Sequence, residues 1–306
     1  MNRHAYLIMA HNHFDFLKEL LLCLDDRRND IYLHIDKKAG SLDLNQFSTD
    51  LKESRLFFTD RLDVRWGGYS QIACELLLLK AAAGCSHGGR NGACPDETSA
   101  PRNHEKGYAY YHLLSGSDLP LKSQDEIHAF FDRHAGKEFL AFDKELSRQA
   151  RERVSLWHFF RESRSPLAEP ADHVLTLLQR LLHIDRLKGT GIELRKGPNW
   201  FSITDGLAQY VLEHEDWIRK HFSHSVCADE LFLQTLAAAS PFRENIYDEE
   251  GKSGSMANLR YVDWERGNEN SPYTFQEEDK ELLLGLPHLF ARKFERNILK
   301  MNLPSH

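Results

Sequence analysis

"HAYLIMA", residues 4–10, is an apolar run of strand length, and a helical pattern follows it at residues 13–24. A second apolar run, "IYLHID" (31–36), comes next. A strand, a helix and a strand in close succession predict a βαβ unit, in which the two strands lie parallel. We therefore expect the fold to be built on a parallel sheet.

The rest of the chain continues this alternation. Further strands are predicted at "RLFFTD" (55–60), "YAYYHLL" (108–114), "EFLAFD" (138–143), "LRYVDW" (259–264) and the terminal "LFARKF". Helices are predicted at 70–83, 123–134, 172–187, 205–221 and 228–239. This order predicts an α/β fold with a mostly parallel central sheet flanked by helices. We expect one domain over residues 1–306, with a nucleotide-binding half at 1–145, because ligands of such sheets gather at the carboxyl ends of the strands.

Composition and charge limit the class of protein. The 306 residues are 41% hydrophobic and carry a formal charge of −7, so they can bury a large core but offer no general basic face for DNA or RNA. We find no signal-peptide pattern and no apolar run of about 18 residues, and we expect a cytoplasmic protein. Five irregularly spaced cysteines argue against a disulfide framework.

Residues 84–106 resemble an insertion. They are rich in Gly, Pro, Ser and Asn with little that could pack, and this composition predicts a flexible loop. A zinc site from the Cys and His residues of this loop is conceivable, but no C-x-x-C pair gives the tight ligand spacing of structural zinc sites. No metal site is therefore predicted.

Polar or aromatic side chains follow three of the predicted strands. Asp36 ends the second strand, where its carboxylate would either bind a ribose or base edge or cap a turn. Trp66 stands before Gly67 and Gly68, and it would either stack on a ligand, which the two glycines let the backbone approach, or belong to the core. Asp118 lies in a loop after the fourth strand. Because the carboxyl ends of parallel strands share one edge, we expect these groups at one rim.

Two further stretches carry candidate residues. In "CADELFLQTLAAAS" (227–240), Glu230 is either a first-turn acid favoured by the helix dipole or a general base whose pKa is raised beside the apolar face that follows it. In "HLFARKFE" (288–295), Arg292 and Lys293 stand among aromatic residues, where they are either snorkelling side chains or ligands of an anion.

The order of these motifs is more specific than any one of them. "HIDKK", "WGGYSQI", "LLSGSDLPLKS", "KGPNWF", "ADELFLQT", "NLRYVDW" followed by "SP", and "LFARKFE" together resemble the branching N-acetylglucosaminyltransferase and peptide O-xylosyltransferase family, over residues 4–297. The motifs "WGG" and "ARKFE" are more similar to its xylosyltransferase branch. The resemblance implies an inverting glycosyltransferase of GT-A-like fold that uses a UDP-sugar.

The resemblance also implies residue roles: Asp36 holds the uridine, Trp66 flanks the base, Asp118 faces the donor sugar, Glu230 is the catalytic base, Arg292 and Lys293 bind the diphosphate, and Trp264 lines the acceptor side. The half at 146–306 would then bind the acceptor and carry the base. Two features depart from the family pattern. Tyr273 stands where branching enzymes carry an arginine, so Arg292 would have to do its work, and the loop at 84–106 is longer than expected.

The chemistry of the diphosphate agrees with this assignment. The sequence has no Asp-x-Asp, the motif with which most GT-A enzymes hold a metal, so an adjacent Arg and Lys would neutralise the leaving group without a metal or other cofactor. Expected partners are a UDP-sugar carrying xylose or N-acetylglucosamine and a carbohydrate, glycolipid or protein acceptor, with possible peripheral membrane contact and no nucleic acid. Two alternatives stay open: an inactive carbohydrate-binding homologue and a glycoside hydrolase, which would need two carboxylates and no diphosphate site.

Overall fold

The computed structural model describes residues 2–87, 107–268 and 271–299. Its strands are β1 His4–Ala10, β2 Asn29–Ile35, β3 Arg55–Phe58, β4 Tyr110–Ser115, β5 Asp118–Pro120, β6 Ser202–Ile203, β7 Arg260–Val262 and β8 Phe290–Arg292. Its α-helices are α1 Phe14–Cys23, α2 Tyr69–His87, α3 Gln124–Arg133, α4 Arg148–Ser155, α5 Ala168–Leu181, α6 Asp205–Glu213, α7 Glu215–Phe222, α8 Phe232–Ala238 and α9 Lys280–Gly285. Two short 3₁₀ helices matter below, η1 Lys37–Ala39 and η4 Ala228–Glu230.

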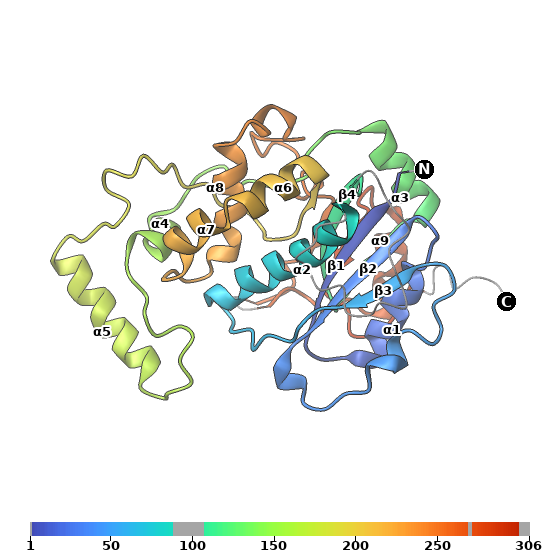
Figure 1. The fold of residues 1–306 in the computed structure, drawn as a ribbon, viewed down its shortest axis with the longest axis horizontal. Helices are drawn as coiled ribbons and strands as arrows, with labels where there is room; N and C mark the ends of the chain where they lie inside the picture. Colours follow the sequence, from blue (N-terminus) through green and yellow to red (C-terminus); the bar gives the residue numbers. More distant parts are fainter. Residues whose placement is uncertain (1, 88–106, 269–270, 300–306) are drawn as a thin grey trace.

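The strands form two sheets. Figure 1 labels four strands of the larger one, β1 to β4. The large sheet has the order β3-β2-β1-β4-β6, with β1, β2, β3 and β4 parallel and β6 antiparallel to β4. The small sheet has the order β5-β8-β7, and β8 is antiparallel to β5 and parallel to β7. The prediction of an α/β fold with a mostly parallel central sheet flanked by helices is confirmed.

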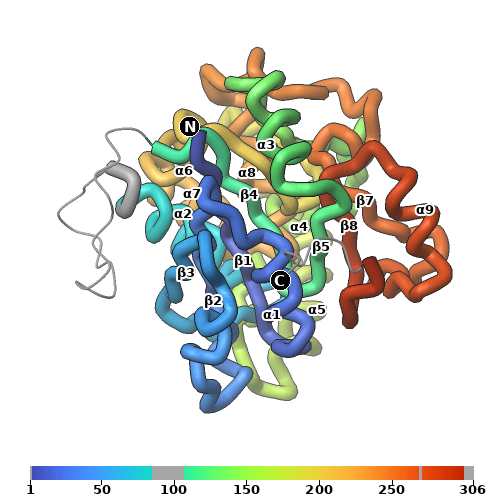
Figure 2. The backbone as a smooth tube through the Cα atoms, turned by 90° about the vertical axis from the view of Figure 1, so that its right-hand side faces the viewer, coloured from blue at the N-terminus to red at the C-terminus, as the bar shows by residue number. Residues whose placement is uncertain are grey.

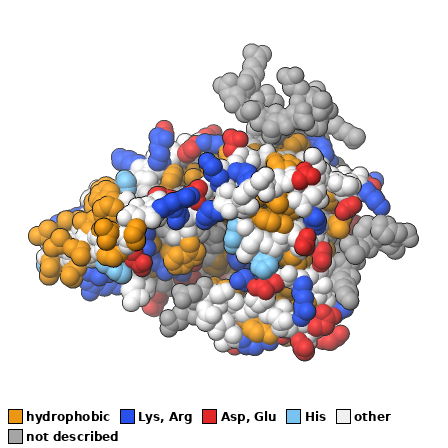
Figure 3. Space-filling view, turned by 90° about the horizontal axis from the view of Figure 1, so that it is seen from below, with side chains coloured by type: hydrophobic (Ala, Val, Ile, Leu, Met, Phe, Trp, Pro, Cys, Tyr) orange, Lys and Arg blue, Asp and Glu red, His pale blue; other side chains and the backbone are white. Residues whose placement is uncertain are grey.

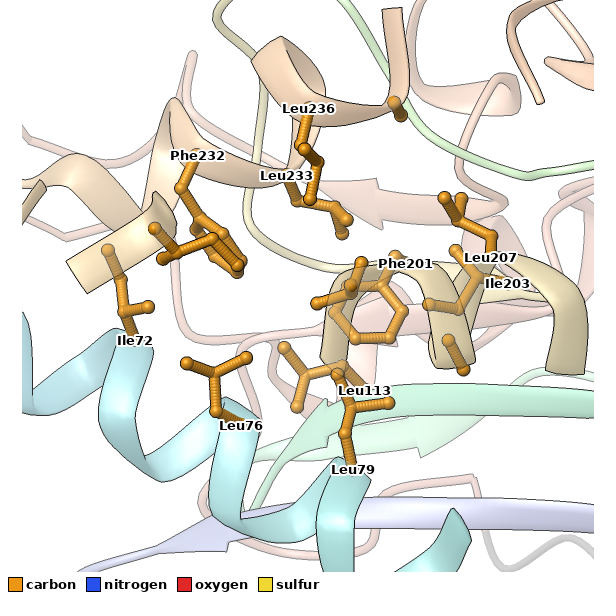
Figure 4. Close-up of a cluster of buried hydrophobic side chains, with 14 of the residues drawn as sticks. Ile72, Leu76, Leu79, Leu113, Phe201, Ile203, Leu207, Phe232, Leu233 and Leu236 are labelled. Carbon is orange, nitrogen blue, oxygen red and sulfur yellow. The ribbon is translucent and has the colours of Figure 1, made fainter. Parts of the chain in front are cut away.

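Helices cover both faces of the large sheet, which explains why β1 reads as a continuous apolar run. On one face, Leu7 joins a core with α2, α6 and α8 (Figure 4). On the other face, Ile8 joins a core with α1, α3, α9 and the small sheet (Figure 2). Successive strand residues thus point into different cores, as the pleat of a strand requires.

Several predicted elements differ from the structure. Residues 138–143 form no strand, since Glu138 and Phe139 make single bridges and the chain then leaves the ladder. The helix predicted at 205–221 is two helices, because His214 leaves the helical conformation between α6 and α7. The helix predicted at 172–187 ends at Leu181, since His183 adopts a left-handed conformation with φ 54°.

The predicted loop at 84–106 lies largely outside the described residues. Its first four residues, 84–87, belong to the end of α2 and not to a loop. The side chains considered for a zinc site are outside the described part of the chain. Among the residues that the structure does describe, no helix has the length and apolar composition needed to cross a membrane.

Candidate active site

A cavity of about 750 Å³ opens where the parallel strands of the large sheet end. Its lining includes His11 after β1, Asp36 after β2 and Ser115 at the end of β4. The opposite wall comes from the small sheet. Five of the seven predicted site residues line this cavity: Asp36, Trp66, Glu230, Trp264 and Arg292. Residues from five separate parts of the sequence therefore meet in one space.

Asp36 lies at the amino end of η1 and is almost completely buried. Its backbone N–H donates to the carbonyl of Ala10 at 2.8 Å, which ties the end of β2 to the end of β1. One carboxylate oxygen, Oδ1, accepts from the N–H of Lys38 at 2.8 Å, and the other lies 3.5 Å from Lys38 Nζ. Asp36 thus caps a turn as one reading expected, and its side chain also lines the cavity, whereas binding of a ribose or base edge stays a prediction.

Trp66 stands at the rim of the cavity with 75% of its surface exposed. An exposed indole at a cavity mouth can stack on a planar ligand. The two glycines that follow it are in contact with other parts of the chain. Gly67 has a φ of 71° and approaches Cys227, and a Cβ on Gly68 would collide with Glu162. Gly67 is thus favoured by its positive φ, a Cβ on Gly68 would displace the end of the Glu162 side chain, and neither glycine lines the cavity.

Arg292 is held in place on the small-sheet side. Its guanidinium lies over the ring of Trp200, with 4.3 Å from Cζ to the ring centroid, and Nε lies 3.6 Å from Oδ1 of Asp118. Burial lowers the pKa of Arg292 from its usual value, and Asp118 opposes that effect. The aromatic contact and the carboxylate together orient a cation toward the cavity.

Asp118 differs from its predicted place in a loop. It belongs to strand β5 instead of a loop, it is fully buried, and it does not contribute to the described cavity lining. Ser115 donates its N–H to Oδ2 at 3.1 Å and its hydroxyl to Oδ1 at 2.5 Å. Burial raises the pKa of Asp118, and Arg292 opposes this. Its carboxylate is therefore covered in this structure and lies 3.6 Å from Nε of Arg292, and the predicted contact with the donor sugar stays a prediction.

Lys293 also lies away from the described lining. It follows β8, so its side chain leaves in a different direction from that of Arg292, and its Nζ lies 3.4 Å from the hydroxyl of Ser271. Its charge still reaches the cavity edge, because it adds to the lowering of the pKa of His11, which is caused mainly by burial. The predicted pair of diphosphate ligands therefore divides into one wall residue and one peripheral cation.

Glu230 ends η4 and faces the cavity, with its carboxylate partly exposed. Arg153 donates from Nη1 to Oε2 at 2.7 Å, and Nζ of Lys196 lies 3.7 Å from the same oxygen. Two cations therefore hold the Glu230 carboxylate at the cavity wall. The apolar surroundings expected from Leu231 and Phe232 are absent around the carboxylate, because both side chains pack into the core.

Two more carboxyl groups lie in the same region but are buried. Burial raises the pKa of Asp229 to about 7, and it raises the pKa of Glu75 well above its usual value. Gln71 donates from Nε2 to Asp229 Oδ2 at 3.0 Å. Of Glu75, Asp229 and Glu230, it is Glu230 that faces the cavity and is paired with cations.

Trp264, with 58% of its surface exposed, lines the cavity just after β7. Arg266 follows it closely, but its guanidinium turns away and pairs with Asp263 and Asp279. Arg266 also lies over the ring of Tyr273, 4.1 Å from its centroid. Tyr273, the position that departs from the family pattern, is thus covered by an arginine that does not belong to the described lining.

Sequence reasoning missed several wall residues. Arg260 is fully buried, lines the cavity, and donates to the hydroxyl of Ser202 at 2.8 Å and to the carbonyl of Phe201 at 2.6 Å. Burial lowers its pKa to about 9. Lys196 and Trp200 also line the cavity. Arg260 and Lys196 do lie inside quoted motifs, "NLRYVDW" and "KGPNWF". The sequence could not show that their side chains point toward the cavity.

The described residues contain no group of three or more His, Cys, Asp and Glu side chains arranged to hold a metal ion. The charges that the structure places at the cavity are those of Lys38, Lys196, Arg260 and Arg292, facing the carboxylates of Asp36, Asp143 and Glu230. A cavity with both cations and a partly exposed carboxylate can bind an anionic substrate and accept a proton beside it.

Comparisons with known proteins identify the family of this chain and several relatives. Residues 103–283 match the family described as Core-2/I-Branching enzyme. The chain is 24% identical to Xylosyltransferase 2 of Bos taurus over 311 residues, which is 96% of this chain and 32% of that protein. It is 21% identical to Xylosyltransferase 1 of Homo sapiens, over 96% of this chain and 29% of that protein. The chain thus spans about a third of the length of these curated relatives.

A solved structure, that of mouse Xyloside xylosyltransferase 1 in its apo form, matches 79% of this chain and 83% of its own, with 10% identity and a TM-score of 0.30. A similarity at this level does not establish a shared fold. The family match covers more than half of the chain and includes Asp118, Lys196 and Glu230. The chain therefore belongs to the Core-2/I-branching enzyme family, a family of glycosyltransferases.

Proposed function

We propose that this protein is an inverting, metal-independent glycosyltransferase of GT-A-like fold, which moves xylose or N-acetylglucosamine from a UDP-sugar to an acceptor hydroxyl. The observation that carries the proposal is the meeting of Asp36, Trp66, Glu230 and Arg292 in one cavity. The similarity to xylosyltransferases over nearly the whole chain supports xylose as one candidate donor sugar.

In the proposed reaction, Asp36 and Trp66 bind the uridine at the end of the large sheet. Arg292 faces the diphosphate, and Trp264 faces the acceptor. Glu230 takes the proton of the acceptor hydroxyl while that oxygen attacks the anomeric carbon from the side opposite the diphosphate. The bond from the anomeric carbon to the diphosphate breaks, its electron pair leaves with UDP, and the configuration inverts without a covalent intermediate.

Buried and oriented cations support a reaction without a metal. Charge grows on the diphosphate as its bond to the sugar breaks, and fixed donors in a site of low dielectric stabilise that charge without reorganising. Arg292 is fixed by Trp200 and Asp118, and Arg260 is fixed by its contacts to Phe201 and Ser202. These features support the Arg side chains as the source of positive charge.

A thermal-unfolding screen of nucleotides tests the proposal. UDP, UDP-xylose and UDP-N-acetylglucosamine should raise the melting temperature, since a ligand at 100 times its Kd adds about 2.7 kcal/mol to the free energy of unfolding. GDP-mannose serves as the control donor and should have little effect. The variant Asp36→Ala should lose most of the UDP-induced shift. Stabilisation by GDP-mannose without any by UDP compounds would refute the proposed donor class.

A further inference from the structure

Helix α5 has its polar stripe against the protein and its apolar stripe in solvent. Asp172, Thr176 and Gln179 are buried, whereas the leucines at 177, 178 and 181 are exposed, with 66% of Leu181 in solvent. Amphipathic helices on soluble proteins normally do the reverse. An apolar face turned outward marks a surface that contacts something else.

Polar contacts fix this orientation. Asp172 Oδ2 lies 2.8 Å from Nδ1 of His158, and Gln179 exchanges two hydrogen bonds with the backbone of Trp157, at 2.7 Å and 2.9 Å. Arg180 pairs with Glu152 on α4 at 2.8 Å. Turning the helix to hide its leucines would break these contacts, so the exposed apolar face is specified by the sequence.

The apolar surface continues beyond the helix. It forms the end of the molecule that projects from the sheet (Figure 1), and hydrophobic side chains gather there in the space-filling view (Figure 3). We define the docking surface by its exposed hydrophobic residues: Phe159, Phe160, Leu167, Val174, Leu177, Leu178, Leu181, Leu182 and Ile184. Phenylalanines at the edge of such a surface suit the boundary between water and acyl chains.

The charge around the docking surface differs from that of the whole chain. Residues 148–188 contain eight Arg and Lys against five Asp and Glu, whereas the complete chain has a formal charge of −7. Arg164, Arg180 and Lys188 are exposed beside the apolar residues. Arg164 and Arg180 make surface ion pairs with Asp63 and Glu152, and solvent-exposed pairs of this kind are weak enough to exchange for a lipid phosphate. An apolar face with a surplus of cations complements a surface that is apolar inside and anionic outside.

We propose that the docking surface binds anionic phospholipid bilayers, with the leucines of α5 entering the acyl boundary and Arg164, Arg180 and Lys188 meeting lipid phosphates. A second copy of the chain is a poorer occupant. A two-fold contact repeats the same patch on both partners, so it would bring two sets of these cations into one interface. The projecting shape also suits insertion into a bilayer better than a flat contact (Figure 3).

The docking surface is connected to the rim of the candidate active site. Glu162 accepts from the N–H of Ser70, four residues after Trp66, at 2.8 Å, and Arg164 pairs with Asp63. Helix α4, which α5 contacts through Arg180, carries the Arg153 that pairs with Glu230. Docking would therefore hold the cavity near the bilayer, where a membrane-bound acceptor can reach it. This consequence rests on the proposed function, but docking itself does not.

Vesicle co-sedimentation tests the proposal. The wild-type protein should sediment with vesicles of phosphatidylcholine and phosphatidylglycerol and less with phosphatidylcholine alone. The variant Leu177→Gln/Leu178→Gln/Leu181→Gln should lose about tenfold or more in apparent affinity, because it removes three apolar side chains from the inserted face. The matched control is Leu282→Gln on α9, which changes a leucine that is 49% exposed elsewhere and should bind like wild type. Circular dichroism should show the same fold for all variants, and the single variant Leu181→Gln gives a milder test.

Failure of the wild-type protein to bind anionic vesicles would overturn the proposal, and so would equal loss in the Leu282→Gln control. A wild-type dimer in sedimentation velocity that the triple variant converts to monomer, without vesicle binding by either, would assign the surface to a second copy instead. None of these readouts uses turnover or nucleotide binding, so failure of docking and failure of the proposed function are distinguishable.

Discussion

The two walls of the cavity hold their functional groups in different ways. On the small-sheet wall, Arg260 and Arg292 come from strands and are fixed by buried carbonyls, an aromatic ring and a carboxylate. On the turn wall, Asp36, Trp66 and Glu230 come from 3₁₀ turns and a strand-to-helix connection, and the last two are substantially exposed. Rigid cations suit stabilisation of a transition state, whereas accessible groups on turns suit substrate binding and proton transfer.

The largest effect should come from Glu230→Gln. This change keeps the size and hydrogen bonding of the side chain but removes its ability to accept a proton, so turnover should fall by roughly 10²–10⁴. UDP affinity by calorimetry should stay near that of wild type. The control Glu215→Gln changes a glutamate on α7 that pairs with Lys80, away from the cavity lining. Retained turnover in Glu230→Gln would end the assignment of the base.

The next largest effect should come from Arg292→Ala. Removing one preorganised donor should cost about 3–4 kcal/mol in kcat, with a smaller loss in ground-state UDP affinity. Arg292→Lys should also be damaging, since a point charge cannot reproduce the guanidinium fork. The matched control is Lys293→Ala, in the adjacent residue. Because Lys293 lies outside the described lining, removing its charge should lower kcat clearly less. Equal losses in steady-state kinetics would remove the distinction between wall and periphery.

Substitution of two tryptophans tests which side of the cavity binds the donor and which binds the acceptor. Trp66→Ala should weaken UDP binding by about 1–3 kcal/mol, by analogy with stacking of bases on aromatic side chains. Trp264→Ala should leave UDP affinity unchanged and raise the KM of the acceptor. Calorimetry and acceptor kinetics measure both. The opposite pattern would exchange the assigned sides of the cavity.

A smaller effect concerns the buried carboxyl groups near Glu230. Because burial raises the pKa of Glu75, the folded protein keeps it protonated at a pH where the unfolded chain ionises it. Wild-type stability from this group is therefore lost as pH rises above the unfolded pKa. Glu75→Gln should become more favourable relative to wild type as pH increases, by up to about 1.4 kcal/mol per pH unit. Urea unfolding at pH 5 and pH 7 checks this, and an identical difference at both values would contradict it.

The sequence predicted the large sheet well because its signals are local. "HAYLIMA" is β1 residue for residue, and the runs for β2, β3 and β4 are each placed within two residues at either end. The small sheet was harder to predict from the sequence, because β5 has only three residues and pairs with β8, which lies far along the chain. Residues 138–143 have strand composition but no partner along their length.

The sequence predicted which residues form the candidate site better than it predicted where their side chains point. The order of motifs identified Asp36, Trp66, Glu230, Trp264 and Arg292, which the structure brings together. It could not show that Asp118 would be covered by Arg292, or that Lys293 would turn toward Ser271, because both depend on side-chain directions in paired strands. Arg153 was missed because its contact with Glu230 joins residues 77 apart in sequence.

The most direct test of the central claim, that arginine side chains of the small-sheet wall take the place of a metal ion, is turnover of the wild-type protein in excess EDTA. The measurement follows UDP release from the donor sugar that the nucleotide screen selects, with and without chelator, and after Mn²⁺ is added back. We predict the same turnover in all three conditions, since Arg292 and Arg260 already supply positive charge at the cavity. Loss of turnover in EDTA that Mn²⁺ restores would contradict the claim.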